Sequence, residues 1–107
     1  MQTITVEELK DWLDDQRRDR PLLLDVREQW ERALCALPDS LHMPMNAVPA
    51  RTGELDPAAH TVVFCHHGGR SFQVGGFLER SGFAHVYNLV GGVDAWARRI
   101  DPSMATY

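Results

Sequence analysis

Amphipathic stretches alternate with short apolar runs along this chain, and each type predicts a different element. Apolar side chains recur at helical spacing near the N-terminus, at Val6, Leu9, Trp12 and Leu13. Thr5 and Glu8 precede and overlap this stretch as a capping box, in which each side chain accepts a hydrogen bond from the other residue's backbone amide. The helix should end before Pro21, because the residue before a proline disfavours helical geometry.

Continuous apolar and β-branched runs predict strands that are buried on both faces. These runs are Leu22–Leu24 and Thr61–Phe64. Val86–Val90 is predicted as another strand and Leu41–Met43 as a short one. Further helices are predicted over Glu28–Leu34, Arg70–Arg80 and Val93–Arg99. Residues 44–60 contain three prolines and are predicted to be mostly connection, with one helical turn near Val48–Arg51. Alternating strands and helices predict an α/β fold, with a central parallel sheet flanked by helices on both faces.

Composition restricts the function classes without naming one. A chain of 107 residues with 44% hydrophobic and 24% charged residues predicts a single folded domain over residues 1–107. The net charge of −4 argues against a nucleic-acid partner. The N-terminus has no basic targeting region and no long apolar run, so we expect no membrane association and a cytoplasmic location.

The charge is unevenly distributed along the chain. Residues 1–60 hold 12 acidic and 7 basic residues, whereas residues 61–107 hold 3 acidic and 4 basic residues. The two cysteines, Cys35 and Cys65, are too few for a disulfide scaffold or a four-thiolate zinc site. In a reducing compartment both are expected to be thiols.

Cys65 directly follows a predicted central strand and opens the segment 65–71, Cys-His-His-Gly-Gly-Arg-Ser, which we call the Cys65 loop. A short loop that leads into a helix leaves several backbone amides without helical partners, and Gly68 and Gly69 allow these amides to converge on the sulfur. Such a setting lowers the pKa of a thiol from about 8.5 to between about 3.5 and 7.5. Arg70 adds a cation, and His66 and His67 add donors whose charge depends on pH near neutrality.

The sequence also admits other interpretations of Cys65. A cysteine at the end of a buried strand is often only a small hydrophobic residue. A metal site at Cys65, His66 and His67 is disfavoured, because adjacent loop residues rarely converge on one ion. A cysteine–histidine dyad needs a histidine distant in sequence, and nothing in the sequence selects His42 or His85 for that role.

Three motifs together resemble a single-domain rhodanese across about residues 4–100. They are Leu24-Asp-Val-Arg-Glu28, the Cys65 loop and Gly91-Gly-Val-Asp-Ala-Trp96. The resemblance implies a parallel sheet of about five strands and sulfurtransferase chemistry. In that chemistry a cysteine takes a sulfane sulfur from a small anionic donor such as thiosulfate, or from a persulfide. It then passes the sulfur to cyanide, to a thiol, or to a protein acceptor or a thioredoxin-like reductant.

The resemblance also implies roles for individual positions. Cys65 would carry the persulfide, and the amides of residues 66–71, up to Ser71, would form its cradle. Asp25 and Arg27 would shape the site from the neighbouring strand end, and a purely structural ion pair is the alternative for these two residues. Arg70 would stabilise the charge of the departing sulfite. No metal or organic cofactor is implied beyond the cysteine persulfide.

Loop length distinguishes this pattern from rhodanese-fold phosphatases, which resemble it but carry five residues between cysteine and arginine. Here four residues separate Cys65 from Arg70, which favours a loop sized for a sulfur atom. His66 stands where many family members carry a basic residue. We therefore expect activity to change between about pH 5.5 and 7.5 if a protonated histidine assists donor binding.

A regulatory or sulfur-carrier module that serves a protein partner is the alternative to an enzyme, and an intact Cys65 does not separate the two. Cys35 is interpreted as a structural residue, because no cationic neighbour is apparent in the sequence. The C-terminal residues 100–107 are expected to form an extended strap.

Overall fold

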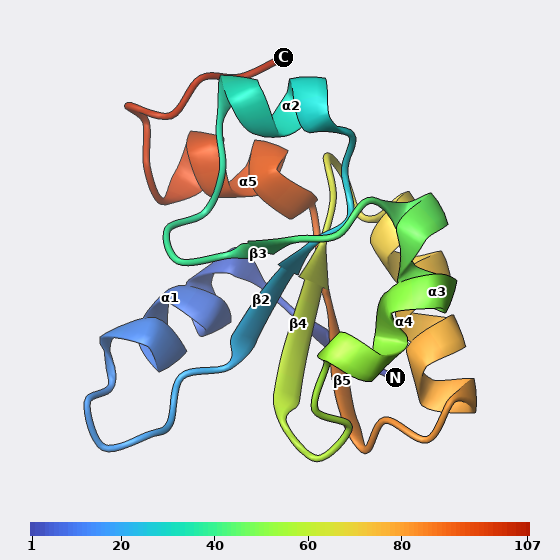
Figure 1. The fold of residues 1–107 in the computed structure, drawn as a ribbon. Coiled ribbons are helices and arrows are strands. Elements are labelled where there is room, and N and C mark those ends of the chain that lie inside the picture. Colours follow the sequence, from blue (N-terminus) through green and yellow to red (C-terminus); the bar gives the residue numbers. More distant parts are fainter.

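A central sheet of five parallel strands organises the protein, which is described here as a computed structural model covering residues 1–107. The strands lie in the order β1-β5-β4-β2-β3, and Figure 1 shows helices on both sides of them. The strands are β1 (Gln2–Ile4), β2 (Leu22–Asp25), β3 (Leu41–His42), β4 (His60–Phe64) and β5 (His85–Leu89). This architecture confirms the predicted α/β fold.

Two helical layers cover the two faces of the sheet, with α1 and α5 on one face and α3 and α4 on the other (Figure 1). The helices are α1 (Val6–Asp14), α2 (Gln29–Leu34), α3 (Val48–Arg51), α4 (Gly69–Arg80) and α5 (Gly92–Arg99). Neighbouring residues of one strand serve opposite layers: Val62 packs with α1 and α5, whereas Val63 packs with α4. Both faces are therefore buried, as the continuous apolar runs predict.

The predicted elements agree with the structure except at two places. The capping box of Thr5 and Glu8 is present at the start of α1. Strand β1 was not predicted, because it is three residues long and buries only Ile4. Residues 44–60 hold two short 3₁₀ turns, Met45–Ala47 and Thr52–Glu54, in addition to the expected turn at Val48–Arg51.

The parallel sheet brings three strand ends to one edge. Asp25 ends β2 and lies opposite Phe64, the last residue of β4, so that Cys65 follows at the same level. Gly91 and Gly92 follow β5 at this edge and begin α5. The carboxyl edge of a parallel sheet is where sites form in such folds. None of the helices has the length and hydrophobicity that a membrane crossing requires.

Candidate active site

The sulfur of Cys65 is held by backbone amides at the start of α4. The residue is 1% exposed, and its Sγ accepts hydrogen bonds from the amides of Gly68 at 3.1 Å and Ser71 at 3.5 Å. Gly68 precedes the helix with φ of +122°, a backbone conformation that residues other than glycine rarely adopt. This turn points the free amides of the helix N-terminus at the sulfur.

These donors outweigh the effect of burial on the thiol. Burial alone raises the pKa of Cys65, but the hydroxyl of Ser71 and the amides of Ser71, Gly68 and His67 lower it, and the net shift is downward. A lowered pKa increases the fraction of thiolate, which is the nucleophilic form of cysteine. The geometry therefore suits Cys65 to nucleophilic chemistry.

Asn88, on β5, extends the donor network behind the sulfur. The Ser71 hydroxyl lies 3.4 Å from Cys65 Sγ and donates to Asn88 Oδ1, while the Asn88 side-chain amide donates to the Gly68 carbonyl at 3.2 Å. Ser71 has a single hydroxyl proton, so Asn88 and the sulfur compete for it. Asn88 thus connects Ser71 on α4 to the Gly68 carbonyl of the loop.

Helix α5 fixes the other side of the loop. The amide of Val93 donates to the Cys65 carbonyl at 2.9 Å, and that of Asp94 donates to the His66 carbonyl at 3.1 Å. A Cβ atom at Gly92 would lie 2.3 Å from the Cys65 carbonyl oxygen, and the residue has φ of +56°. Only glycine allows α5 to approach the loop this closely.

Arg70 is not a free cation in the structure. Its guanidinium donates to both carboxylate oxygens of Glu31, at 2.6 Å and 2.8 Å. The side chain of Glu31 is 3% exposed, and the hydrogen bonds from Arg70 lower its pKa to about 2. The sequence places a cation at Arg70, and the structure adds its partner, the Glu31 carboxylate from α2.

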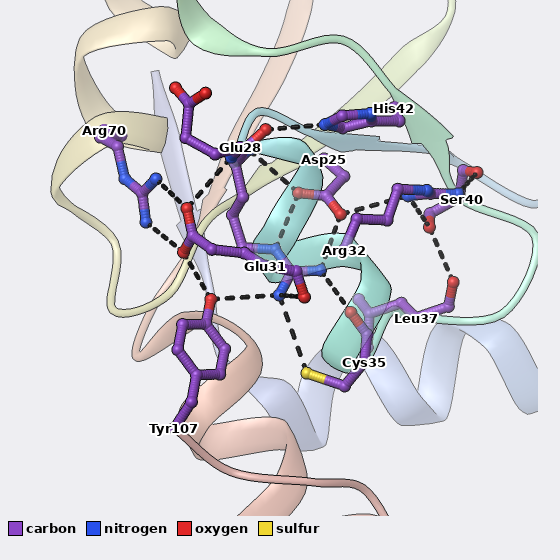
Figure 2. A network of polar contacts seen from close by, with 11 residues as sticks. Asp25, Glu28, Glu31, Arg32, Cys35, Leu37, Ser40, His42, Arg70 and Tyr107 are labelled. Carbon is purple, nitrogen blue, oxygen red and sulfur yellow. Dashed lines mark hydrogen bonds and ion pairs between the residues drawn. The ribbon is translucent and has the colours of Figure 1, made fainter.

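Tyr107, the last residue of the chain, lies in the same network (Figure 2). Its hydroxyl donates to Glu31 Oε2 at 2.6 Å and accepts a hydrogen bond from Arg27 Nη1 at 3.1 Å. Burial and the neighbouring Glu31 carboxylate raise the pKa of Tyr107 to about 12. The expected strap thus ends inside the site, and Figure 1 shows the C-terminal segment beside α2.

Asp25 and Arg27 form a fully buried ion pair next to this network. Arg27 donates to Asp25 from Nε at 2.9 Å and from Nη2 at 2.8 Å, and Arg32 adds a contact to Asp25 at 3.1 Å. No hydrogen bond or ion pair joins Asp25 or Arg27 to Cys65. The pair reaches the Cys65 loop indirectly, from Arg27 through Tyr107 and Glu31 to Arg70.

The two histidines of the loop occupy different environments. The His66 ring stacks on Tyr107 with centroids 3.9 Å apart, and burial followed by the charge of His67 lowers the pKa of His66. His67 is exposed and lies 3.9 Å from Asp94. A lowered pKa keeps His66 neutral at pH 7, so its contribution to the expected pH response moves toward lower pH.

Cys35, at the end of α2, has a cationic neighbour after all. Arg27 Nη1 lies 3.7 Å from Cys35 Sγ, and Arg27 Nη2 donates to the Cys35 carbonyl at 2.7 Å (Figure 2). The sequence-based argument that Cys35 lacks a cation is therefore wrong, because Arg27 is folded back from the adjacent strand end.

Nowhere do three histidine, cysteine or acidic side chains cluster as a metal site requires.

Comparison with known proteins identifies the family. The family model described as "Rhodanese-like domain" matches residues 5–99. The chain belongs to the rhodanese-like domain family. Among solved structures, a rhodanese-like domain protein from Staphylococcus aureus has 28% sequence identity and a TM-score of 0.85, with coverage of 100% of this chain and 99% of that one.

Curated relatives of this rhodanese-like domain differ in length. A protein of Allochromatium vinosum named "Sulfurtransferase" is 39% identical over 84 residues, which are 78% of each chain. The "Rhodanese-like/PpiC domain-containing protein 12, chloroplastic" of Arabidopsis thaliana is 39% identical over 109 residues. That match spans 97% of this chain but only 36% of the Arabidopsis protein.

Three residues of this rhodanese-like domain's site have no local signal in the sequence. Glu31 and Asn88 reach the Cys65 loop from α2 and β5, and Tyr107 reaches it from the C-terminus by stacking on His66. Each contact joins residues far apart in the sequence, so no local pattern marks it.

Proposed function

We propose that this rhodanese-like domain is a sulfurtransferase in which Cys65 carries the transferred sulfur as a persulfide. The observation that supports the proposal most is the geometry around Cys65 Sγ, which accepts hydrogen bonds from two backbone amides at the start of α4. These amides stabilise a thiolate, and after transfer they face the anionic sulfur of a persulfide. The resemblance to a protein named "Sulfurtransferase" points to the same chemistry.

The proposed reaction has two displacement steps. In the first, the Cys65 thiolate attacks the outer sulfur of a donor, the bond between the two donor sulfurs breaks, and its electron pair leaves with the rest of the donor. With thiosulfate as donor, the leaving group is sulfite and Cys65 becomes a persulfide anion. In the second, an acceptor such as cyanide or a thiol attacks the outer sulfur and regenerates the thiolate. With cyanide the product is thiocyanate, and neither step needs a cofactor.

The chain's own residues have distinct tasks in this scheme. Ser71 and the amides of the loop hold the sulfur in both its thiolate and persulfide forms. Gly92 and the first amides of α5 keep the loop rigid, so that the outer sulfur points to the same place in each cycle. Arg70 and Glu31 line the approach as a neutral pair.

The intact protein's mass after exposure to a donor tests this proposal. Treatment with thiosulfate or glutathione persulfide should add one sulfur atom, cyanide should then remove it, and Cys65→Ser should abolish the gain. The variant Cys35→Ser is the matched control and should load normally. Failure to gain sulfur from either donor would overturn the proposal, and hydrolysis of an aryl phosphate would then favour a phosphatase.

A sulfur-carrier module that serves a protein partner is a second candidate, supported by exposed aromatic residues. Trp30 is 62% exposed and Phe72 is 60% exposed, and these two residues lie on α2 and α4, the helices that supply Glu31 and Arg70. Phe72 also lines a groove of about 480 Å³ with Met45, Val48 and Phe77. Sulfur loading from a protein persulfide alone, with none from small donors, would favour the carrier over the enzyme.

A further inference from the structure

We infer that Glu31 is a specificity-determining residue, which pairs with Arg70 and thereby suits the Cys65 site to an organic persulfide rather than to thiosulfate. The inference rests on the proposed sulfurtransferase function and names the donor class of the same site. It follows from the charges that surround Cys65 and from how each of them is paired.

The two donor classes make different electrostatic demands. Thiosulfate is a dianion, so its approach to the Cys65 thiolate brings three negative charges together and releases a sulfite dianion. A neutral organic persulfide, R–S–SH, brings only the thiolate's own charge. Its reaction with Cys65 gives R–S⁻ and Cys65–S–SH, so atoms and charge balance with no further reactant. Thiosulfate therefore needs an unpaired cation at the site, whereas the organic persulfide does not.

Arg70 is the only guanidinium in the Cys65 loop, and its charge is already paired. Both of its terminal nitrogens donate to Glu31. Glu31 is held in place from two further sides, by the Tyr107 hydroxyl at 2.6 Å and by the Glu28 amide at 3.0 Å. The carboxylate is buried and fully hydrogen-bonded, so it cannot move aside at low cost when a donor arrives.

The other cations at this edge of the sheet are paired as well. Arg27 and Arg32 both contact the Asp25 carboxylate, and Arg27 is fully buried. Arg98 pairs with Asp94, the acid that also lies beside His67. Every arginine of the site thus has a carboxylate partner, and none offers an unpaired charge to a dianion.

Exposed aromatic side chains on α2 and α4, the helices that supply Glu31 and Arg70, offer apolar surface instead. Trp30 precedes Glu31 on α2, and Phe72 follows Arg70 by two residues on α4. Both aromatic side chains are more than half exposed. The apolar part of an organic persulfide gains contact area from such side chains, whereas thiosulfate has no apolar part to bury.

Donor specificity measured on the wild type and on Glu31→Gln tests the inference. With cyanide as the common acceptor, kcat/KM is determined for thiosulfate and for 2-hydroxyethyl persulfide, an organic persulfide that carries no ionisable group besides its S–SH. The wild type should favour the organic persulfide. Glu31→Gln keeps the size of the side chain but frees the charge of Arg70. It should raise the ratio of kcat/KM for thiosulfate to kcat/KM for the persulfide about tenfold, about 1.4 kcal/mol.

A matched control separates the site from overall charge. Glu54→Gln removes one negative charge from an exposed pair with Arg51 and should leave both kcat/KM values unchanged. A wild type that prefers thiosulfate would overturn the inference even if Glu31→Gln does not fold. An unchanged donor ratio in a folded Glu31→Gln protein would overturn it while leaving the proposed sulfurtransferase function intact. If the wild type loads from neither donor, the proposed function itself fails.

Discussion

The two cysteines of the molecule, Cys65 and Cys35, lie at opposite ends of helices and have different hydrogen-bond donors. Cys65 Sγ accepts hydrogen bonds from backbone amides at the N-terminal end of α4. Cys35 Sγ lies at the C-terminal end of α2, with one guanidinium nitrogen of Arg27 at 3.7 Å. A helix N-terminus favours an anion, and a helix C-terminus disfavours one. The nearest cation to Cys35 is also committed to Asp25.

Backbone amides, and not the nearest positive side chain, are therefore what favours an anion at Cys65. Arg27 contacts Cys35, yet its charge balances a buried carboxylate and holds the strand end in place. The amides around Cys65 have no competing partner and can serve a sulfur anion directly.

Removal of each sulfur in turn should give the largest contrast. Cys65→Ser should lower sulfur transfer to cyanide by at least about a thousandfold, because serine forms no persulfide. Cys35→Ser should retain most of the wild-type rate, since Cys35 has no hydrogen bond to the Cys65 loop. Steady-state thiocyanate formation measures both variants, and equal losses in the two would break the distinction.

Loss of the charge partner near Cys35 should affect stability more than chemistry. Asp25→Asn leaves the fully buried Arg27 without a counter-charge, which typically costs about 3–5 kcal/mol. Urea denaturation should therefore show a large drop in the free energy of unfolding. The exposed pair offers a control: Glu54→Gln should change that free energy by less than about 1 kcal/mol. A similar loss in both variants would contradict the structural role of Asp25.

The free energy of unfolding should fall in acid, because Glu31 in the network between the two cysteines becomes protonated. Glu31 has a pKa lowered to about 2 by Arg70, below the 4.5 of the unfolded chain, so its stabilisation is present above about pH 4.5. It should disappear as the pH falls through about 2, a loss of about 3 kcal/mol relative to Glu31→Gln. Denaturation of both proteins across that range measures it. A difference in stability that stays constant with pH would contradict the lowered pKa.

Ser71→Ala should produce the smallest effect and should act on Cys65 alone. The hydroxyl helps to lower the pKa of Cys65, so its removal should raise that pKa and slow alkylation by iodoacetamide at pH 7 by roughly tenfold. Cys35 in the same sample serves as the internal reference, and its alkylation rate should not change. Equal slowing at both cysteines would indicate a general structural effect.

The sequence predicts the frame of the molecule better than the details of the site. The strands β2, β4 and β5 were predictable because their apolar runs are buried on both faces, and the Cys65 loop was predictable from its glycines and its position. Strand β1 has too little apolar pattern to be recognised. Glu31 was not predictable, because it contacts Arg70 across 39 positions of sequence while its apolar neighbours on α2 face solvent.

Tyr107, at the C-terminus, was not predictable from the sequence either. Tyr107 follows a polar segment with no helical or strand pattern, yet its hydroxyl reaches Glu31, 76 positions earlier in the chain. Such long-range polar contacts depend on how the strand ends are juxtaposed, and local propensity carries no information about them. The family resemblance identified Cys65, Asp25 and Arg27 as site positions, but the partner that neutralises Arg70 became visible only in three dimensions.

The most direct test of the central claim is to locate the transferred sulfur within the chain. After incubation with glutathione persulfide, the protein is alkylated, digested and analysed by peptide mass spectrometry. Our account predicts an additional sulfur atom on the peptide that contains Cys65 and none on the peptide that contains Cys35. Sulfur found mainly on the Cys35 peptide, or equally on both peptides, would contradict it.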